Sequence, residues 1–224
     1  MDRKVGDLLD TLEQTGLADN TLVVFASDHG DMLCEKEMVQ KRCFYEWSCR
    51  VPLIARFPAG WQAGTVCDTP VSLIDLLPTF CEIAGTEAAL PHDGESLIGI
   101  LDKPPRHRIA FAQAHEAVGM PCIMARQGPY KYNYIHGHED QLFDLAADPG
   151  EWNNLAADPT HGTIAGRLRR AILDRFDPEI MARETNASLL RRQLIDQTMS
   201  RHGQTWCHFP QFDYRRGASS QHLP

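Results

Sequence analysis

The sequence lacks the features that mark membrane, secreted and nucleic-acid-binding proteins. No apolar run approaches the roughly 20 residues needed to span a bilayer, and the opening MDRKVGDLLD does not have the pattern of a signal peptide. A net charge of -8 does not provide the positive field that phosphate binding needs. We therefore expect a cytoplasmic protein whose main partner is neither a nucleic acid nor a membrane.

The cysteines also lack any pairing or zinc-binding pattern. There are 7, an odd number, and none of them forms C-x-x-C. A zinc knuckle and a thioredoxin-type pair are therefore absent. Scattered, reduced thiols in core or loop positions are the expected state, in agreement with a cytoplasmic location.

The patterning that is present predicts an α/β fold. The 224 residues, 43% of them hydrophobic and 23% charged, suffice for one core with a smaller layer appended. Apolar residues at helical spacing from Val5 to Leu12 predict a helix that stops at Gly16. The stretches Thr21–Ala26 and Val51–Phe57 predict buried strands, the first covered on both faces. Helix, short turn and buried strand favour a parallel sheet with helices.

After a predicted helix at Val71–Gly85, with a bend marked by proline and a glycine stop, the strands become short and closely spaced. Their connections are of hairpin length, which predicts a small antiparallel sheet. The predicted strands are Arg108–His115, Cys122–Gln127, Tyr130–Ile135 and Gln141–Leu145.

Two further helices and a tail complete the predicted organisation. The helices are expected over 161–177 and 178–203, and the rest of the chain has no period. We therefore divide the sequence into an α/β part (1–105), a small α+β subdomain with an antiparallel sheet (106–203) and an extended tail (204–224). His136 and His138 fall in a predicted hairpin loop, where we expect solvated side chains rather than a metal site.

The strand ending at Ala26 is followed by the polar sequence Ser-Asp-His-Gly-Asp. Open α/β sheets place their ligands at the carboxyl ends of strands, and Gly30 would allow a tight turn beside Asp28 and His29. A carboxylate and an imidazole together suit a divalent cation such as calcium, magnesium or manganese. The alternative is a surface loop in which Asp28 caps the next segment and His29 is solvated.

A longer block around these residues resembles a known family. The sequence SDHGDMLCEKEMVQKRCFYEWSCRVPLI resembles the S-D-H-G-D-M-L-G-E…K…F-F-E…R-V-P-L-I block of type I sulfatases, in the alkaline phosphatase superfamily. VSLIDLLPTF, DGESL and YKYNYIHGHEDQLFDLAADPGEWNNLA follow in the family's order. The sequences DHGDML and CIMARQGPYKY are most similar to the choline sulfatase group. The resemblance implies a partial alkaline-phosphatase-like catalytic domain over 1–105.

The resemblance also implies roles for individual residues. Asp28 and His29 match the second pair of ligands to the active-site divalent metal, with calcium expected first and manganese or magnesium as alternatives. Lys41 matches the lysine that contacts the substrate, a small organic sulfate ester, and neutralises charge on the leaving oxygen. A fixed cation is well suited to this task, because sulfuryl transfer spreads negative charge over oxygens.

Two parts of the family's active site are missing from the sequence. None of the cysteines lies in C-x-P-x-R, the motif whose cysteine becomes the formylglycine nucleophile, so no nucleophile is assigned. An early strand ending in Asp-Asp, which would supply the first ligand pair, is also absent. The chain therefore resembles a carboxyl portion, and we expect it to hydrolyse no sulfate ester alone.

Some positions depart from the family pattern. Cys34 replaces a glycine, and because such a position can require a positive φ, we expect strain in the loop that carries Lys41. Trp47 replaces a small residue, and Cys207 replaces an acidic residue of the choline-sulfatase tail. Tail aromatics could join subunits into a homo-oligomer or pack on the chain's own surface: Trp206, Phe209, Phe212 and Tyr214.

Two other functions remain open at this point. A related group, the phosphonate monoester and phosphodiester hydrolases, shares the D-H-G and lysine pattern, and sulfate and phosphate esters have the same tetrahedral shape. The missing nucleophile alternatively favours a non-catalytic module for oligomerisation or binding.

Overall fold

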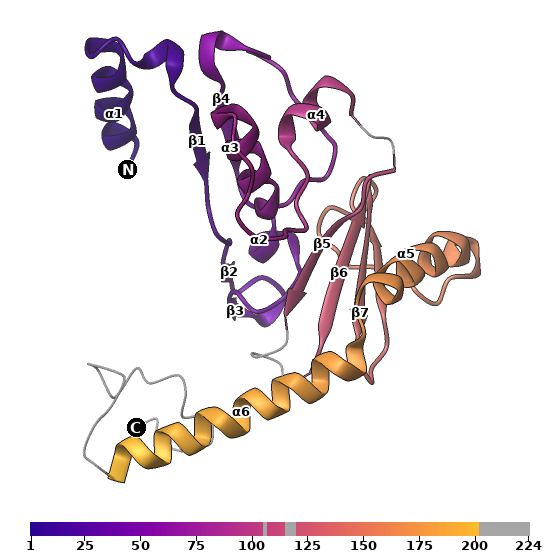
Figure 1. The fold of residues 1–224 in the computed structure, drawn as a ribbon. Coiled ribbons are helices and arrows are strands. Elements are labelled where there is room, and N and C mark those ends of the chain that lie inside the picture. The colour runs from indigo at the N-terminus through magenta and orange to yellow at the C-terminus, as the bar shows by residue number, and fades with distance from the viewer. Residues whose placement is uncertain (105–106, 115–119, 202–224) are drawn as a thin grey trace.

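The computed structural model describes residues 1–104, 107–114 and 120–201. In it the chain forms an N-terminal region with two small sheets and a C-terminal region with one larger sheet (Figure 1). The N-terminal elements are α1 (Asp2–Gln14), β1 (Val23–Ala26), β2 (Met32–Leu33), β3 (Val39–Gln40), α2 (Glu46–Cys49), β4 (Leu53–Arg56), α3 (Leu76–Ala84) and α4 (Leu97–Asp102). The C-terminal elements are β5 (Ala110–Ala114), β6 (Cys122–Gln127), β7 (Tyr130–Ile135), β8 (Gln141–Asp144), α5 (Gly162–Arg175) and α6 (Pro178–Arg201).

The first helix forms where the apolar spacing predicted it, but none of its side chains is buried. It ends at Gln14, with Thr15 as its C-cap, and Gly16 follows with a φ of 72°, the left-handed conformation that glycine adopts without strain. No residue of α1 is buried. Its attachment is polar, since Arg56 of β4 pairs with Glu13 at 3.4 Å.

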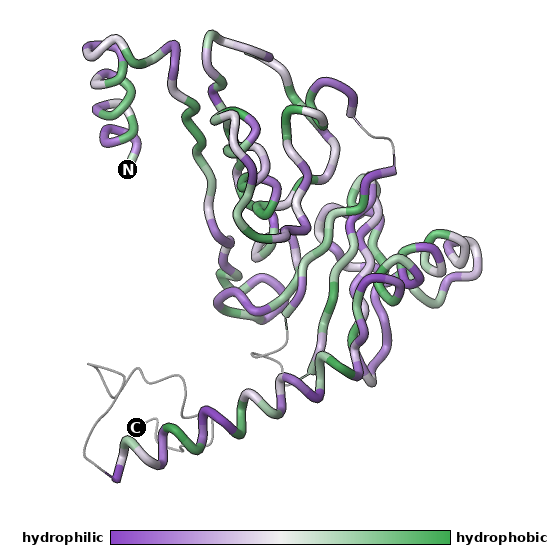
Figure 2. The backbone as a smooth tube through the Cα atoms, viewed as in Figure 1, coloured by the Kyte–Doolittle hydropathy of each residue, from purple (hydrophilic) through white to green (hydrophobic). Residues whose placement is uncertain are grey.

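The pairing of β1 differs from the expected parallel sheet. β1 pairs antiparallel with β4, from Val23 opposite Arg56 to Ala26 opposite Leu53, and within the described residues neither strand has another partner. The expectation that β1 is covered on both faces is therefore wrong here. Phe25 is 39% exposed and Ile54 64% exposed, and Figure 2 shows the hydrophobic course of β1. Apolar runs predict that a strand will be covered, but they do not name the element that covers it.

The predicted helix near residue 71 begins with one tight turn and continues as α3. A 3-10 turn over Leu73–Asp75 comes first, and Ser72 and Asp75 form a reciprocal capping box. Pro78 lies in the first turn of α3, where its missing N–H leaves no hydrogen bond unmade. The helix stops at Gly85, which has a φ of 65°.

The predicted antiparallel sheet is confirmed. Its order is β5-β6-β7-β8, and every neighbouring pair is antiparallel. The β6–β7 hairpin turns at Gly128 and Pro129, with Gly128 at a φ of 52°. Gly-Pro between two periodic runs is a turn signal that depends only on local sequence.

A compact core joins this sheet to α5. One buried cluster contains residues from β6, β7, β8 and α5: Ile123, Ala125, Tyr132, Leu142, Ala165, Leu168 and Ile172. They alternate along the strands and recur at helical spacing along α5, so each element presents one apolar face to the other.

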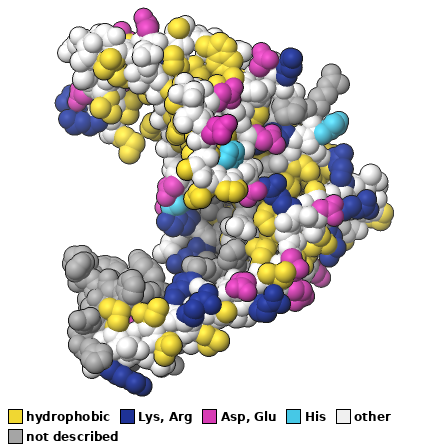
Figure 3. Space-filling model, viewed as in Figure 1, with side chains coloured by type: hydrophobic (Ala, Val, Ile, Leu, Met, Phe, Trp, Pro, Cys, Tyr) yellow, Lys and Arg dark blue, Asp and Glu magenta, His cyan; other side chains and the backbone are white. Residues whose placement is uncertain are grey.

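The last helix is much less covered. Only Pro178 of α6 is buried, and Leu190 and Leu194 are 66% and 65% exposed. Hydrophobic and basic side chains both reach the surface along it (Figure 3). The predicted tail (204–224), with Trp206, Cys207, Phe209, Phe212 and Tyr214, lies outside the described residues.

Three other expectations concern the whole chain. The division at residues 105 and 106 stays a prediction. The described cysteines are all free, as expected: Cys34, Cys43, Cys49, Cys67, Cys81 and Cys122. Among the described helices, none combines the length and apolar character that crossing a membrane requires.

Candidate functional site

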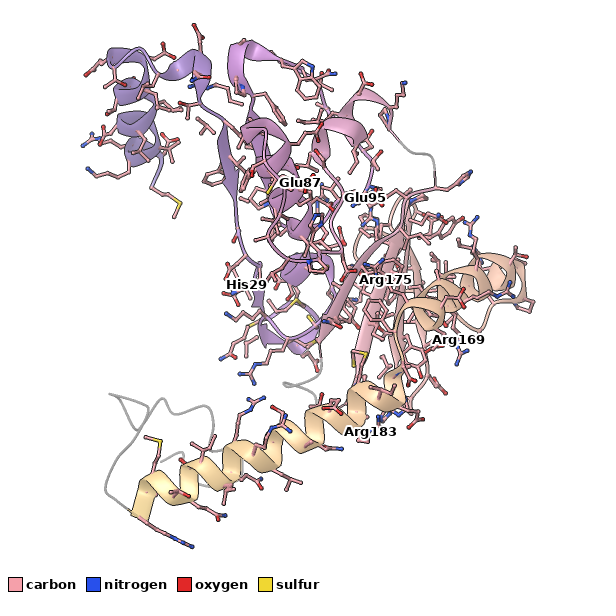
Figure 4. All side chains as sticks on the ribbon, viewed as in Figure 1. His29, Glu87, Glu95, Arg169, Arg175 and Arg183 are labelled. Atoms are coloured by element: carbon pink, nitrogen blue, oxygen red, sulfur yellow. The ribbon has the colours of Figure 1, made fainter. Side chains whose placement is uncertain are left out.

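The structure brings together the three residues that the sequence singled out. Asp28 and His29 follow β1 directly, and Lys41 follows β3. The Asp28 Oδ2 atom lies 3.3 Å from Nε2 of His29, and Lys41 Nζ lies 2.5 Å from the same nitrogen. Figure 4 places His29 at the end of β1, beyond the strand pairing. A carboxylate, an imidazole and an ammonium thus meet at one sheet end.

The turn that carries His29 is fixed by its neighbours. The Ser27 hydroxyl donates to the His29 carbonyl at 2.8 Å, and the Gly30 N–H donates to the Ser48 carbonyl at 2.8 Å. A Cβ atom at Gly30 would lie 2.0 Å from the Trp47 carbonyl oxygen. Only glycine fits this close approach to α2. The contact uses the backbone of Trp47, so the unusual side chain there does not remove it.

The hydrogen bonding of His29 determines which ring nitrogen carries the lone pair. Nδ1 lies 2.6 Å from the Gly30 carbonyl oxygen. A carbonyl only accepts hydrogen bonds, so Nδ1 carries the proton in this arrangement. In the neutral ring the Nε2 lone pair then faces Asp28 and Lys41. This is the orientation in which a histidine binds a metal ion.

The carboxylate of Asp28 is kept ionised. The His29 backbone N–H donates to Oδ1 at 3.0 Å and lowers the pKa of Asp28 against an opposing effect of desolvation, and the charge of Lys41 adds a smaller lowering. The side chain is 83% exposed, so solvent weakens these interactions. An exposed, ionised carboxylate is available as a ligand.

The loop that delivers Lys41 has an unusual backbone. β2 and β3 form a short antiparallel hairpin with Met32 opposite Gln40. Cys34, at the family's glycine position, has a φ of 83°, and Lys36 and Glu37 are also left-handed, at 52° and 59°. The expected positive φ at Cys34 is therefore confirmed. Such conformations are disfavoured for residues with a side chain and persist only where surrounding contacts hold them.

The side chains of Asp28 and His29 would fit a hard divalent cation only as part of a larger site. An ionised oxygen and an imidazole nitrogen are suitable donors, but calcium takes about six to eight oxygen ligands. Within the described ranges, no group of three or more histidine, cysteine, aspartate or glutamate side chains could hold a metal ion. A complete calcium site would therefore need more donors than these two side chains provide.

Sequence reasoning missed a buried ion cluster formed by Glu46, Lys131 and Glu151. Lys131 Nζ lies 2.6 Å from Glu151 Oε1 and 2.8 Å from Glu46 Oε1. The side chains of Lys131 and Glu151 are fully buried. The sequence signal was present, since YKY and DPGE both belong to quoted family blocks, but it did not indicate that the two charges pair.

A second buried network lies around Asp75. Its carboxylate accepts the backbone N–H groups of Ser72 and Glu95 at 2.7 and 2.9 Å, and Arg108 pairs with it at 2.7 Å. Arg108 also pairs with Glu95 at 3.3 Å. Figure 4 shows Glu95 well separated from His29. This network therefore explains the VSLID and DGESL blocks as structural, because it joins the start of α3 to the chain before β5.

The two loop histidines behave differently. His138 is exposed, as expected. His136 is not simply solvated: its Nδ1 lies 3.2 Å from the Tyr134 hydroxyl and its Nε2 lies 3.7 Å from Glu179. That expectation is wrong for His136 because the first turn of α6 passes over the hairpin.

Comparisons with known proteins show a likeness to sulfatases. The sulfatase family model matches residues 1–86. The chain is 37% identical over 220 residues to choline-sulfatase of Rhizobium meliloti (strain 1021), covering 94% of this chain and 42% of that protein. It is 34% identical over 184 residues to Delta 4,5-hexuronate-2-O-sulfatase of Bacteroides thetaiotaomicron, covering 78% of this chain and 38% of that protein. The chain thus spans less than half the length of these relatives.

Solved structures show the same likeness. A 2-O GAG sulfatase superposes with a TM-score of 0.68 at 33% identity, covering 83% of this chain and 42% of that one. A phosphonate monoester hydrolase of Agrobacterium radiobacter superposes with a TM-score of 0.68 at 28% identity, covering 77% and 38%.

Proposed function

From the match of residues 1–86 to the sulfatase family model and the likeness to sulfatase relatives, we propose that this chain is the carboxyl portion of a metal-dependent sulfuric ester hydrolase. The observation that carries the proposal is the meeting of Asp28, His29 and Lys41 at the end of β1. In this proposal Asp28 and His29 are metal ligands, and Lys41 contacts the sulfate ester.

Each residue has a distinct task in the proposed reaction. Asp28 supplies an ionised oxygen, and His29 supplies Nε2, because the Gly30 carbonyl engages its other nitrogen. The bound cation would polarise the sulfuryl oxygens. Lys41 holds a positive charge beside the oxygen that leaves, where a fixed cation stabilises developing negative charge. Calcium suits the carboxylate best in our proposal, with manganese or magnesium as alternatives.

The chain is proposed to need a complementary portion for turnover. The sequence contains no C-x-P-x-R, and β1 and β4 leave apolar side chains exposed within the described residues. Figure 3 shows such side chains at the surface of the N-terminal region. We therefore propose that the missing nucleophile and the remaining ligands lie in a segment that covers this surface.

The proposed substrate is a small organic sulfate ester. This rests on the sulfatase relatives, two of which are named for choline and hexuronate sulfates. The second candidate is a phosphonate monoester, favoured by the likeness to the Agrobacterium radiobacter hydrolase. Both substrates present a tetrahedral anion to Lys41, so the described residues serve either reaction.

A homo-oligomer joined through the tail (204–224) is proposed, and the exposed apolar face of α6 supports the presence of a protein partner. Leu190 and Leu194 stand in solvent on a helix that buries only Pro178, and exposed apolar surface of this kind favours a protein partner. The cytoplasmic location stays a prediction.

The test uses what we call the completed enzyme. In it, this chain is joined to the amino-terminal portion of the Rhizobium meliloti choline-sulfatase, which the matched region of that protein does not include. We expect hydrolysis of nitrophenyl sulfate to exceed that of a nitrophenyl phosphonate, and the 224-residue chain to hydrolyse neither. Lys41→Ala should lower kcat about 10²–10³-fold, the usual effect of removing one charge-stabilising group. Lys103→Ala, an exposed lysine before β5, serves as control. Turnover by the 224-residue chain alone would contradict the proposal, as would an unimpaired Lys41→Ala enzyme.

A further inference from the structure

We infer that Glu151, in the C-terminal region, is a positioning residue that holds both the His29 turn and the Lys41 loop. The inference rests on the proposed function, because only in that function does the position of His29 and Lys41 affect metal binding and catalysis. Its structural content is a linkage from one residue to two separate segments, one held by the buried carboxylate of Glu151 and the other by its backbone carbonyl.

The first contact joins Glu151 to the helix behind the His29 turn. Glu151 Oε2 accepts the backbone N–H of Glu46, the first residue of α2, at 2.7 Å. Two residues along, the Ser48 carbonyl accepts the Gly30 N–H at 2.8 Å. Gly30 also lies against the Trp47 carbonyl, with no room for a methyl group. A movement of α2 therefore moves Gly30, and with it the adjacent His29.

The second contact joins the same residue to the Lys41 loop. The Glu151 carbonyl oxygen accepts a hydrogen bond from Lys36 Nζ at 2.6 Å. That ammonium also lies 3.8 Å from the Trp152 ring centre and 4.7 Å from the Tyr45 ring centre, both favourable cation–π distances. Lys36 lies in the left-handed turn between β2 and β3. Its anchoring thus fixes the hairpin from which Lys41 emerges.

The buried ion cluster makes this support rigid. Lys131 of β7 pairs with Glu151 and Glu46 and donates to the Phe44 carbonyl at 2.6 Å. Glu46 also pairs with Arg126 at 3.3 Å, so two cations face two carboxylates. Glu151 itself has a φ of 55°, a conformation that such surrounding contacts maintain. The four-stranded sheet therefore serves as the base on which α2 and the hairpin are placed.

A direct chemical role for the cluster does not fit its surroundings. Lys131 and Glu151 have no exposed side-chain surface, so substrate cannot reach them. Burial raises the pKa of the neighbouring Cys49 thiol to about 11, which leaves a neutral sulfur rather than a nucleophile. Replacing buried ion pairs by apolar residues is often neutral for stability, so the cluster is better explained by the geometry that it sets.

The experiment follows the His29 ring in the 224-residue chain by NMR, with the resonance assigned by its loss in His29→Gln. Glu151→Gln keeps the shape and removes the charge. We expect the His29 ring resonances to shift or broaden in this variant. Asp75→Asn is the matched control, because it removes an equally buried carboxylate paired with Arg108 outside this linkage. It should lower the melting temperature and leave His29 unchanged.

A second variant covers the case in which Glu151→Gln fails to fold. Lys36→Met keeps an apolar stem between the two rings and removes the hydrogen bond to Glu151. It leaves the buried ion cluster intact, so the chain should fold, and the His29 ring should respond because Lys41 lies against Nε2. A His29 resonance unchanged in the folded variants would overturn the inference, as would an equal change in Asp75→Asn. Calcium added to the wild-type chain tests the proposed function separately, since the effect of Glu151 needs no metal.

Discussion

The two regions of the molecule differ in how far they bury their apolar side chains. In the C-terminal region, four strands and α5 enclose a core in which Ile123, Leu142 and Leu168 have no exposed surface. In the N-terminal region, two paired strands leave Phe25 and Ile54 partly or mostly in solvent. One region completes its own core, and the other presents a surface that suits a covering segment. The candidate site belongs to the incomplete region and is braced by the complete one.

The largest effect on stability is expected from removing the contact between the two regions. Glu151→Ala leaves the Lys131 ammonium buried without its closest carboxylate, and breaking a buried pair in this way costs about 3–5 kcal/mol. We expect a loss of this size in the free energy of unfolding, measured in urea. Glu179→Ala, whose side chain is 81% exposed, should stay within about 0.5 kcal/mol of wild type. A loss below about 1 kcal/mol for Glu151→Ala would contradict the bracing role.

The next test compares the two apolar surfaces directly. Leu168→Ala opens a cavity in the enclosed core and should cost about 2–5 kcal/mol. Ile54→Ala, on the exposed face of β4, should change stability by less than about 0.5 kcal/mol in this chain. Urea unfolding followed by circular dichroism measures both. In the completed enzyme the Ile54 effect should grow, because the added segment would bury that face. Equal effects at the two positions in the 224-residue chain would mean that the regions do not differ.

A third prediction concerns the junction between the His29 turn and α2. Gly30→Ala would place its methyl group 2.0 Å from a backbone oxygen, so the turn or the helix must move, at a cost of about 1–3 kcal/mol. Gly99→Ala is the matched control, because nothing lies within 4 Å of that position. There, alanine in a helix should stabilise by up to about 1 kcal/mol. The melting temperature should therefore fall in Gly30→Ala and rise in Gly99→Ala. An unchanged melting temperature in Gly30→Ala would refute the close approach.

The smallest expected effect is a pH dependence at Asp28. Its pKa is lowered, chiefly by the hydrogen bond from the His29 N–H. A carboxyl group with a folded-state pKa below its unfolded value adds stability above the unfolded value, which is lost as pH falls through the folded one. An NMR titration of the Asp28 carboxyl should therefore give a midpoint below that of an ordinary aspartate. Asp28→Asn should lack this acid transition, and a normal or raised midpoint would contradict the geometry.

The parts of this fold that could be predicted from sequence are those set by local signals. β6 and β7 have the predicted bounds because Gly128 and Pro129 separate two periodic runs. The left-handed backbone at Cys34 was foreseen because the family has glycine there. The pairing of β1 was not, since an apolar run says that a strand needs cover but not which strand provides it.

The site was predictable only in part for the same reason. Asp28 and His29 are neighbours in sequence, and the resemblance supplied Lys41. The role of Lys131 was hidden, because a lysine within an alternating strand normally indicates a solvent-facing position. Its burial depends on Glu46 and Glu151, which come from two other segments, and such long-range pairing leaves no local pattern.

The most direct test of the account is calorimetric titration of the metal-free completed enzyme with calcium. We expect one calcium-binding event in the wild-type enzyme. Asp28→Asn and His29→Gln should each lower the calcium affinity by more than the roughly 10–100-fold that is typical of losing a residue that only hydrogen-bonds a ligand. Asp158→Asn, an aspartate that caps the turn before α5, should bind like the wild type. Unchanged affinity in the Asp28 and His29 variants would show that the end of β1 does not hold the cation.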